Sequence, residues 1–259
     1  MATKINQVNN FDISKLTFSE PRKNKKNGQQ VLINYETGSD RGPLILQTPK
    51  LLAPFGVDSK QYDDNAVKYS INFSLTNDTE DTSNPVANFT NVINAVDNKV
   101  KTSGFENSTK WFGAKKSREI IDEFFKPCVK RSPDPEKAKK YPPVFQVKLV
   151  VYDGQPSFKL YDHNKQEIPL LVDDTLDLSC IGSNCYITCI VQCVGVYFMA
   201  GAKFGVSWKL VQAKIHKQES ITGYAIVDPE DEETHEEPTQ EEAPAPYEEY
   251  ETQSEAESA

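Results

Sequence analysis

Strict alternation of apolar and polar residues is the feature of this sequence that most constrains its fold. Between residues 67 and 75 every second residue is apolar, and the residues between them are Lys68, Ser70, Asn72 and Ser74. Successive side chains of a strand point to opposite faces, so this segment has one buried and one solvated face, as in an antiparallel sheet. Many short strands of this kind are typical of a barrel or a sandwich. Further strands are predicted near 11–18, 30–36, 43–48, 144–152, 156–161, 185–198 and 204–215.

Turn and helix signals divide these strands. Asp153-Gly154 predicts a hairpin, and a second turn is expected over 162–165. A helix should begin with Asn84 as its cap and Pro85 in its first turn, and should end near Gly104. A shorter helix is expected over 117–126, and the Pro- and Lys-rich stretch 132–143 is predicted to be an exposed loop. The longer helix should pack onto the sheet through one apolar face, formed by Phe89, Ile93, Val96 and Val100.

Four of the five cysteines lie close together, at residues 180, 185, 189 and 193. Cys185, Cys189 and Cys193 alternate with Ile187 and Val191 at a period of two, which puts these five side chains on one strand face. Free cysteine behaves there as a small hydrophobe, and one straight strand cannot wrap four ligands around a zinc ion. We therefore predict a buried strand rather than a metal site, and we expect no cofactor.

The acidic residues are concentrated at one end of the chain. Residues 228–259 contain 14 Asp or Glu and no Lys or Arg, which leaves residues 1–227 with 29 basic and 24 acidic residues and a net charge of +5. A segment so acidic and so poor in large apolar residues cannot offset its chain entropy by burial. We predict one folded domain over 1–227 and a disordered acidic tail over 228–259.

The sequence carries no membrane or export signal that we recognise. No apolar run approaches the roughly 18–20 residues that cross a bilayer. Residues 1–7 lack the apolar stretch of a signal peptide. We therefore expect an intracellular protein without a membrane partner.

Signals of catalysis are weak. Residues 113–117, GAKKS, resemble the end of a phosphate-binding loop but lack its earlier glycine. Asp173, Asp174 and Asp177 fall between two apolar runs, where a loop is expected. The sequence favours a protein that is not an enzyme, with a nuclease that uses these three carboxylates as the alternative.

Basic residues interleaved with aromatic residues are the stronger functional signal. Rings stack on unpaired bases while Lys and Arg follow the phosphates, which is how proteins hold single strands. The alternative is that the rings belong to the core beside a solvated run of charge. The segment 110–118 combines four cations with two large rings: Lys110, Trp111, Phe112, Lys115, Lys116 and Arg118.

A second segment, 203–210, has a similar composition. Phe204 and Trp208 share the apolar face of the predicted strand, which is more typical of core, whereas Lys203 and Lys209 lie on the other face. Lys68 also faces the solvated side of its strand. All five residues complete the predicted DNA-binding set, with the lysines as phosphate contacts.

Two stretches of the sequence resemble a known family. Residues 42–49, GPLILQTP, lead into LLAPFGV at 51–57, and GAKFGVSWKLVQ lies at 201–212. In this order they resemble the single-stranded DNA-binding proteins of large eukaryotic DNA viruses, which look like distant relatives of the podophage type. The resemblance covers about residues 30–215. It implies an all-β to α+β fold, an OB-like antiparallel β-barrel with a helical insertion, and a role in DNA replication, recombination and repair.

The resemblance also implies partners and a location. We expect single-stranded DNA as the ligand, replication proteins bound through the acidic tail, and a place in the host cytoplasm, in a viral factory, in the nucleus or in the virion. The tail of the phage and bacterial types ends in an aromatic residue, and we expect the segment 246–250, with Tyr247 and Tyr250, to take that role here. The residues leave open RNA in place of DNA, a homo-oligomer, and a virion structural or assembly protein without specific DNA affinity.

Overall fold

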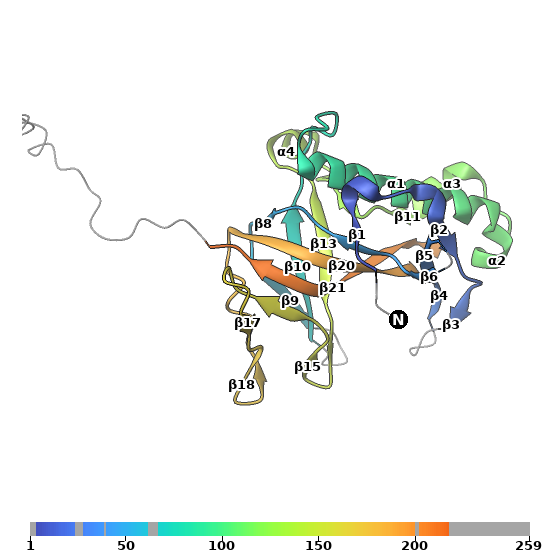
Figure 1. The fold of residues 1–259 in the computed structure, drawn as a ribbon. Helices are drawn as coiled ribbons and strands as arrows, with labels where there is room; N and C mark the ends of the chain where they lie inside the picture. Colours follow the sequence, from blue (N-terminus) through green and yellow to red (C-terminus); the bar gives the residue numbers. More distant parts are fainter. Residues whose placement is uncertain (1–3, 24–27, 39, 62–66, 200–201, 218–259) are drawn as a thin grey trace, which may run out of the picture. The chain divides into compact units, whose positions relative to one another are not determined.

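Five strands close into a barrel in the computed structural model, which describes residues 4–23, 28–38, 40–61, 67–199 and 202–217 (Figure 1). Around the barrel each strand pairs with the next, and β20 and β21 pair with each other to close it. In chain order, strands one, two, three, five and four follow one another around the ring, which is the arrangement of an OB-fold. The five strands are β8 (Leu51–Ala53), β10 (Val67–Ser74), β13 (Val144–Leu149), β20 (Cys185–Phe198) and β21 (Phe204–Ile215).

The predicted OB-like barrel with a helical insertion is therefore confirmed, with one refinement. The pairing of β13 with β21 is parallel rather than antiparallel. The predicted domain boundary at residue 227 and the predicted acidic tail lie outside the described residues.

The two longest strands of the barrel follow the alternation of their sequence. Cys185, Cys189 and Cys193 are buried, as are Ile187 and Val191 between them, so the predicted apolar face of β20 is confirmed. The register of β20 with β21 shifts near Ile190 and again near Cys193. Such bulges bend a strand, which helps a sheet to close on itself.

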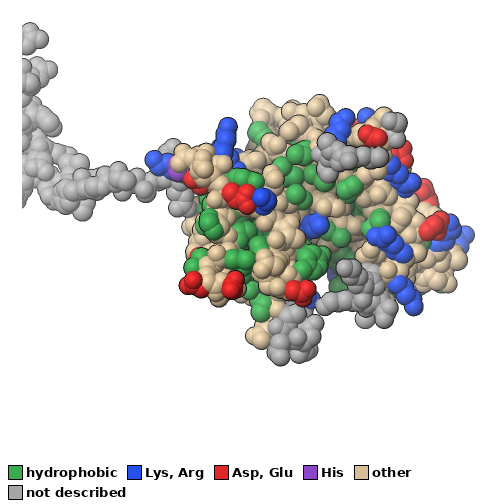
Figure 2. All heavy atoms as spheres, turned by 60° about the horizontal axis from the view of Figure 1, so that its bottom comes forward, with side chains coloured by type: hydrophobic (Ala, Val, Ile, Leu, Met, Phe, Trp, Pro, Cys, Tyr) green, Lys and Arg blue, Asp and Glu red, His purple; other side chains and the backbone are tan. Residues whose placement is uncertain are grey.

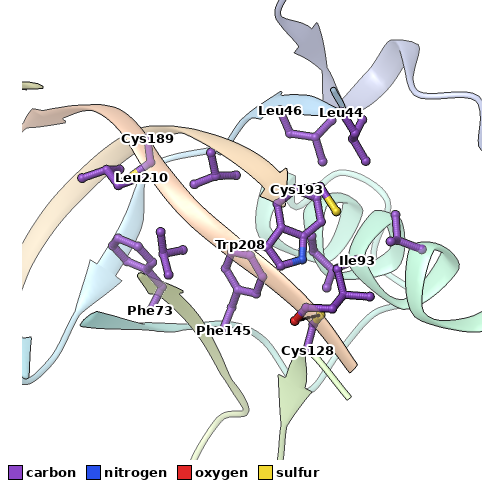
Figure 3. Close-up of a cluster of buried hydrophobic side chains, with 14 of the residues drawn as sticks. Leu44, Leu46, Phe73, Ile93, Cys128, Phe145, Cys189, Cys193, Trp208 and Leu210 are labelled. Carbon is purple, nitrogen blue, oxygen red and sulfur yellow. Dashed lines mark hydrogen bonds between the residues drawn. The ribbon is translucent and has the colours of Figure 1, made fainter. Parts of the chain in front are cut away.

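Aromatic and sulfur-containing side chains fill the barrel. The Trp208 ring lies beneath helix α1 beside Ile93 and Cys128, and it meets Phe145 edge to face at 5.8 Å between ring centroids (Figure 3). Phe73 lies farther along the barrel with Cys189 and Leu210. Because protein interiors are close-packed, truncation of any of these rings would leave a cavity in the core.

Helix α1 (Pro85–Glu106) covers one end of the barrel (Figure 1). The Asn84 side chain accepts a hydrogen bond from the Val86 backbone N–H at 2.9 Å, which confirms the predicted cap. All four residues of the predicted apolar face are fully buried. The helix does not end at Gly104. It ends two residues later, at Glu106, and the Trp111 and Phe204 rings pack beside Gly104, where a Cβ would be in ordinary van der Waals contact with them at 3.4–3.5 Å.

Three shorter helices complete the insertion between the second and third barrel strands: α2 (Ser108–Phe112), α3 (Arg118–Phe124) and α4 (Pro135–Lys140). The predicted helix over 117–126 is present as α3, with Ser117 as its cap, but residues 125 and 126 of the predicted range form strand β11 instead. The prediction of an irregular loop over 132–143 was wrong in part. Asp134 accepts hydrogen bonds from the backbone N–H groups of Glu136 and Lys137, and this cap starts α4.

Small strands extend the barrel sheet and form separate hairpins. The Asp153-Gly154 turn joins two of them, with both residues at positive φ, as predicted. Of the helices in the described ranges, none combines the length and apolar character that crossing a membrane requires. The additional strands are β1 (Asn6–Gln7), β2 (Leu16–Phe18), β3 (Arg22–Lys23), β4 (Gln29–Val31), β5 (Ile33–Thr37), β6 (Asp40–Pro43), β7 (Ile45–Gln47), β9 (Val57–Gln61), β11 (Phe125–Lys126), β12 (Val129–Lys130), β14 (Val151–Tyr152), β15 (Gln155–Pro156), β16 (Lys159–Tyr161), β17 (Glu167–Ile168), β18 (Leu171–Val172) and β19 (Thr175–Leu176).

Candidate nucleic-acid interface

A row of polar side chains crosses the outer face of the barrel. Ser70 on β10 lies opposite Lys148 on β13, Lys148 lies opposite Lys209 on β21, and Lys209 lies opposite Gln192 on β20. The residues before and after Lys148 and Lys209 are buried in the core, so these two side chains point outward. Two lysines from different strands therefore stand side by side on the surface.

Hydrogen bonds tie this row to the neighbouring strands. Lys130 on β12 donates from Nζ to Gln146 Oε1 at 2.8 Å, and Gln146 Nε2 donates to Ser70 Oγ at 3.1 Å. The chain of bonds runs across β12, β13 and β10. It holds the polar side chains at fixed positions and leaves the positive charge of Lys130 at the surface. We call Lys68, Ser70, Lys130, Gln146, Lys148 and Lys209 the strand face.

The electrostatics of the strand face are dominated by lysines. Partial withdrawal from water lowers the pKa of Lys148, and the positive charges of Lys68 and Lys130 lower it further. Lys68 itself lies opposite Lys60 in the pairing of β10 with β9. Asp58 of β9 lies opposite Ser70 in the same pairing, so one carboxylate adjoins these lysines. At Lys148 the neighbouring positive charges are repulsive, and a polyanion bound there would relieve the repulsion.

One aromatic ring adjoins the strand face. The Lys148 Nζ atom lies 5.6 Å from the centroid of the half-buried Tyr197 ring on β20. The ring reaches across β21 at Gly205, where a Cβ would lie 2.8 Å from the Tyr197 hydroxyl oxygen. Gly205 also pairs with Lys126 of β11, whose side chain is exposed. A ring between two lysines is the combination that holds a base next to its phosphates.

Three of the predicted stacking rings are not available at the surface. Trp111 is 3% exposed, Trp208 is 2% exposed and Phe204 is fully buried. Phe112 is half-buried and packs edge to face on Phe204 at 5.0 Å. Their inclusion in the DNA-binding set is corrected: the Trp111, Phe204 and Trp208 rings fill the core, so none of them can stack on a base in this structure.

The predicted basic residues of the 110–118 segment lie in a different place from the strand face. They surround α2, which packs on the hairpin between β20 and β21 through its aromatic residues. Lys110 forms an ion pair with Glu20 at 2.7 Å, and the guanidinium of Arg118 lies over the Phe105 ring at 4.8 Å. Lys115 is exposed and Lys116 is half-buried. These contacts favour the interpretation of a solvated run of charge beside core rings.

Of the predicted cations, the structure brings Lys68 and Lys209 together on the strand face. Lys203 is exposed in the hairpin that joins β20 to β21, one residue before β21 begins at Phe204. Sequence reasoning missed Lys130, Lys148 and Tyr197. Lys148 alternates with buried residues in a segment predicted to be a strand, so its exposure could have been found, but its position opposite Lys209 could not.

The carboxylates considered for a nuclease are spread over a turn. Asp173 and Asp174 both have positive φ and connect β18 with β19, while Asp177 accepts a hydrogen bond from the Ser179 backbone N–H. Within the described ranges, no group of three or more His, Cys, Asp or Glu side chains is arranged to hold a metal ion. The three carboxylates therefore serve as turn residues in this structure.

The charges are unevenly distributed over the surface. In the space-filling view, hydrophobic side chains gather over the middle of the face and Lys and Arg side chains are most frequent toward its right-hand side (Figure 2). Asp and Glu side chains mark its lower left edge. Basic and apolar groups thus adjoin one another over much of this face.

Similarity to known proteins is found among solved structures. No protein-family model matches the chain, and no curated protein matches its sequence. The single-stranded DNA-binding protein from bacteriophage Enc34 matches with a TM-score of 0.40 and 14% identity, over 85% of this chain and 99% of that one. The same phage protein in complex with single-stranded DNA matches with 13% identity over 78% of this chain and 97% of that one, again with a TM-score of 0.40. The gp2.5 single-stranded DNA-binding protein of bacteriophage T7 matches with a TM-score of 0.40 and 11% identity, over 78% of this chain and 100% of that one.

Proposed function

We propose that this chain binds single-stranded DNA on the strand face, with little preference for sequence. The observation that carries the proposal is the pairing of Lys148 with Lys209 beside Lys68, on the third, fifth and second strands of an OB-like barrel, with Lys130 on the adjoining strand β12. In OB-folds the face of strands two and three binds oligonucleotides. Here that face is the β10–β13 pair, which carries Lys68 and Lys148, and Lys209 and Lys130 lie on the strands that pair with β13.

The composition of the strand face fits a single strand better than a duplex. Its charged donors are lysine ammonium groups, which suit phosphates, and the amide of Gln146 is already hydrogen-bonded to Lys130 and Ser70. The Tyr197 ring offers stacking to any base, because every base has a π-face. Affinity that comes mainly from phosphates falls steeply with salt.

The biological role in this proposal follows from the binding mode. A sequence-independent coat protects single strands and presents them during replication, recombination and repair, and it involves no catalytic step. The proposal that this is a protein of a large eukaryotic DNA virus rests on the stretches at 42–57 and 201–212. The proposed location, in the infected cell or in the virion, follows from that viral origin.

The acidic tail has a proposed part in the same mechanism. Fourteen carboxylates on a tether can occupy the basic strand face when DNA is absent, at an effective concentration of about millimolar. DNA that displaces the tail frees it for replication proteins, for which the segment 246–250 offers two tyrosines among glutamates.

Filter binding of labelled oligo(dT) at low and at moderate salt tests the proposal. Binding at low salt that weakens steeply with added salt is the expected result. A virion structural or assembly protein predicts no retention of oligo(dT) at either salt concentration.

Incubation with Mg²⁺ or Mn²⁺ should leave the oligonucleotide intact, whereas metal-dependent cleavage would support the nuclease alternative. Competition by oligo(U) separates DNA preference from RNA preference, because RNA differs at the 2′-hydroxyl.

A further inference from the structure

The outer face of β21 continues past the strand face to a second group of lysines. After Lys209 the register with β20 shifts by one residue, so that Lys214 also lies on the outer face, between buried Ala213 and the end of the strand. Lys214 pairs with Thr188 of β20 on one side and with Tyr161 of β16 on the other. The polar side chain of Gln212 lies between the two lysines along the strand.

A pocket of about 380 Å³ opens at this point on the surface. It contains two lysine side chains, a tyrosine ring and several hydrogen-bonding groups, so it combines cations with an aromatic wall. The lining residues that matter here are Gln47, Tyr161, Lys165, Thr188, Gln212 and Lys214.

A cation and an exposed ring lie at the adjoining end of β20. Lys50 Nζ lies 4.7 Å from the centroid of the Tyr186 ring, which is 44% exposed. The His216 ring forms a hydrogen bond of 2.9 Å with Thr188 Oγ1. Its backbone N–H donates to the Tyr186 carbonyl, which keeps His216 beside β20. Withdrawal from water lowers the pKa of His216, and the charges of Lys50 and Lys214 lower it further, which shows how positive this surface is.

The nearest acidic side chains of the β16–β17 hairpin already have partners. Glu167 forms an ion pair with Lys159 at 2.8 Å, and Asp162 accepts the backbone N–H of Gln166 at 2.8 Å. Lys50, Lys165 and Lys214 therefore form a basic surface around two tyrosine rings. We call Lys50, Lys165, Lys214, Tyr161 and Tyr186 the distal patch.

We propose that the distal patch is a second contact for the same single strand of DNA, which runs along the outer face of β21 from the strand face to the pocket. Continuity favours this occupant, because the polar Gln192 and Gln212 side chains lie between the two basic surfaces on β20 and β21. Charge complementarity favours it as well, because phosphates suit lysines and bases suit exposed tyrosine rings. This inference rests on the proposed function and extends it to a longer site.

The geometry sets the length of strand that the two contacts need. Lys214 follows Lys209 by five positions, but because of the register shift their partners on β20, Gln192 and Thr188, are four positions apart, which corresponds to about 13 Å along a strand. A single strand rises by about 3.4 Å or more per nucleotide, so only an oligonucleotide of about four nucleotides is short enough to fill the strand face without also covering the distal patch. A longer oligonucleotide can contact both, and its affinity should depend more steeply on salt, by about 0.7 in the logarithmic slope for each additional phosphate contact.

The test compares two lengths of oligo(dT) with one variant of the full chain. Lys50→Gln, Lys165→Gln and Lys214→Gln are combined, and binding of dT of about 4 and about 16 nucleotides, the two ends of the range of site sizes of single OB-folds, is measured over a range of salt. We expect the variant to lower the salt slope for the long oligonucleotide by about 2, for three lost contacts, and to leave the short one unchanged.

The matched control is Lys137→Gln, Lys139→Gln and Lys140→Gln on α4, which removes the same charge from exposed positions far from β17 (Figure 1). It should leave both slopes unchanged. Equal effects of the distal variant on both lengths, or no effect on either, would overturn the inference while leaving the proposed function intact. Failure of the parent chain to bind either length would instead remove the proposed function, and the inference with it.

A second arm distinguishes DNA from an acidic peptide as the occupant. The same measurements are made with the chain shortened to residues 1–227. A difference between parent and variant that persists for the long oligonucleotide supports DNA in the distal patch. If parent and variant no longer differ once residues 228–259 are removed, the acidic segment rather than DNA occupies the distal patch, and the inference is overturned.

Discussion

Lys148 and Lys209 lie directly opposite each other where β13 and β21 pair in parallel in the barrel. Like charges at opposed positions of a sheet destabilise it by a few tenths of a kcal/mol or more. A fold that keeps such a pair on its surface gains from a ligand that neutralises it, which is the physical basis of the proposed function.

The first prediction follows from this repulsion. Lys148→Gln should raise the free energy of unfolding by a few tenths of a kcal/mol and weaken binding of oligo(dT) at the same time. Urea denaturation and fluorescence anisotropy measure the two effects on the same sample. Lys137→Gln is the control and should change neither. A variant that loses both stability and affinity would show that Lys148 is needed for the fold rather than for a ligand.

The second prediction concerns the ring beside Lys148. Tyr197→Ala should weaken oligo(dT) binding by about 1–3 kcal/mol, the range for one base–aromatic stack. Tyr197→Phe keeps the ring and should bind within about twofold of the parent. Anisotropy titrations at one salt concentration compare the three proteins. Equal affinity of the Ala and Phe variants would mean that no base stacks on this ring.

The third prediction separates core rings from stacking rings. Both tryptophans are buried, so their fluorescence should be nearly insensitive to added oligo(dT). Trp208→Ala should destabilise the protein by about 3–5 kcal/mol, because it leaves a large cavity next to Phe145. Trp208→Phe should cost less, since it fills more of the space and removes an indole N–H that has no hydrogen-bond partner among the described residues. Strong quenching of tryptophan emission by DNA would contradict the buried placement.

The fourth prediction concerns pH. Burial raises the pKa of Asp97 on α1 from 3.8 to about 6, although the hydrogen bond from Cys128 and the charge of Lys101 oppose the shift. Between these values the folded protein holds a proton that the unfolded chain has released, so the free energy of unfolding should fall as pH rises from about 4 to about 6 and level off above it. The loss amounts to about 3 kcal/mol at 1.36 kcal/mol per pKa unit.

Asp97→Asn tests that interpretation, because the amide oxygen still accepts from the Cys128 N–H and carries no charge. The variant should lose most of the fall in stability across this window, as measured by urea denaturation at pH 4, 6 and 8. Glu123→Gln, at an exposed position of α3, serves as the control for the loss of one carboxylate. A pH profile of Asp97→Asn identical to that of the parent would place the titrating group elsewhere.

The fifth prediction concerns the acidic tail. Deletion of residues 228–259 should tighten oligo(dT) binding at low salt and make it less sensitive to salt, because the competing carboxylates are gone. Binding isotherms at low and moderate salt measure this. Unchanged affinity at low salt would contradict competition between the tail and DNA.

Much of the barrel could be predicted from the sequence because its strands alternate in a simple way. The segments 185–198 and 204–215 were predicted with the bounds that β20 and β21 have. The capped start of α1 was equally clear from Asn84 and Pro85. The end of the helix, predicted near Gly104, lies two residues later at Glu106.

The candidate site was less predictable for the same reason. Lys148 and Lys209 each occupy an outward position that alternation can identify, but only the parallel register of β13 and β21 brings them together. The predicted aromatic residues failed as surface residues because a segment rich in rings and lysines is compatible with both core and interface. In the structure Phe112, Phe198 and Phe204 pack on one another, so these rings belong to the core rather than to an interface.

The central claim, that the strand face binds single-stranded DNA, is tested most directly by the salt dependence of one variant. Lys68→Gln, Lys148→Gln and Lys209→Gln are combined, and binding of oligo(dT) is measured by anisotropy across a range of salt, beside the α4 control variant. We predict that the slope of log affinity against log salt falls by about 2, which corresponds to three phosphate contacts, while the control keeps the slope of the parent. A slope unchanged from that of the parent would contradict the assignment of DNA to this face.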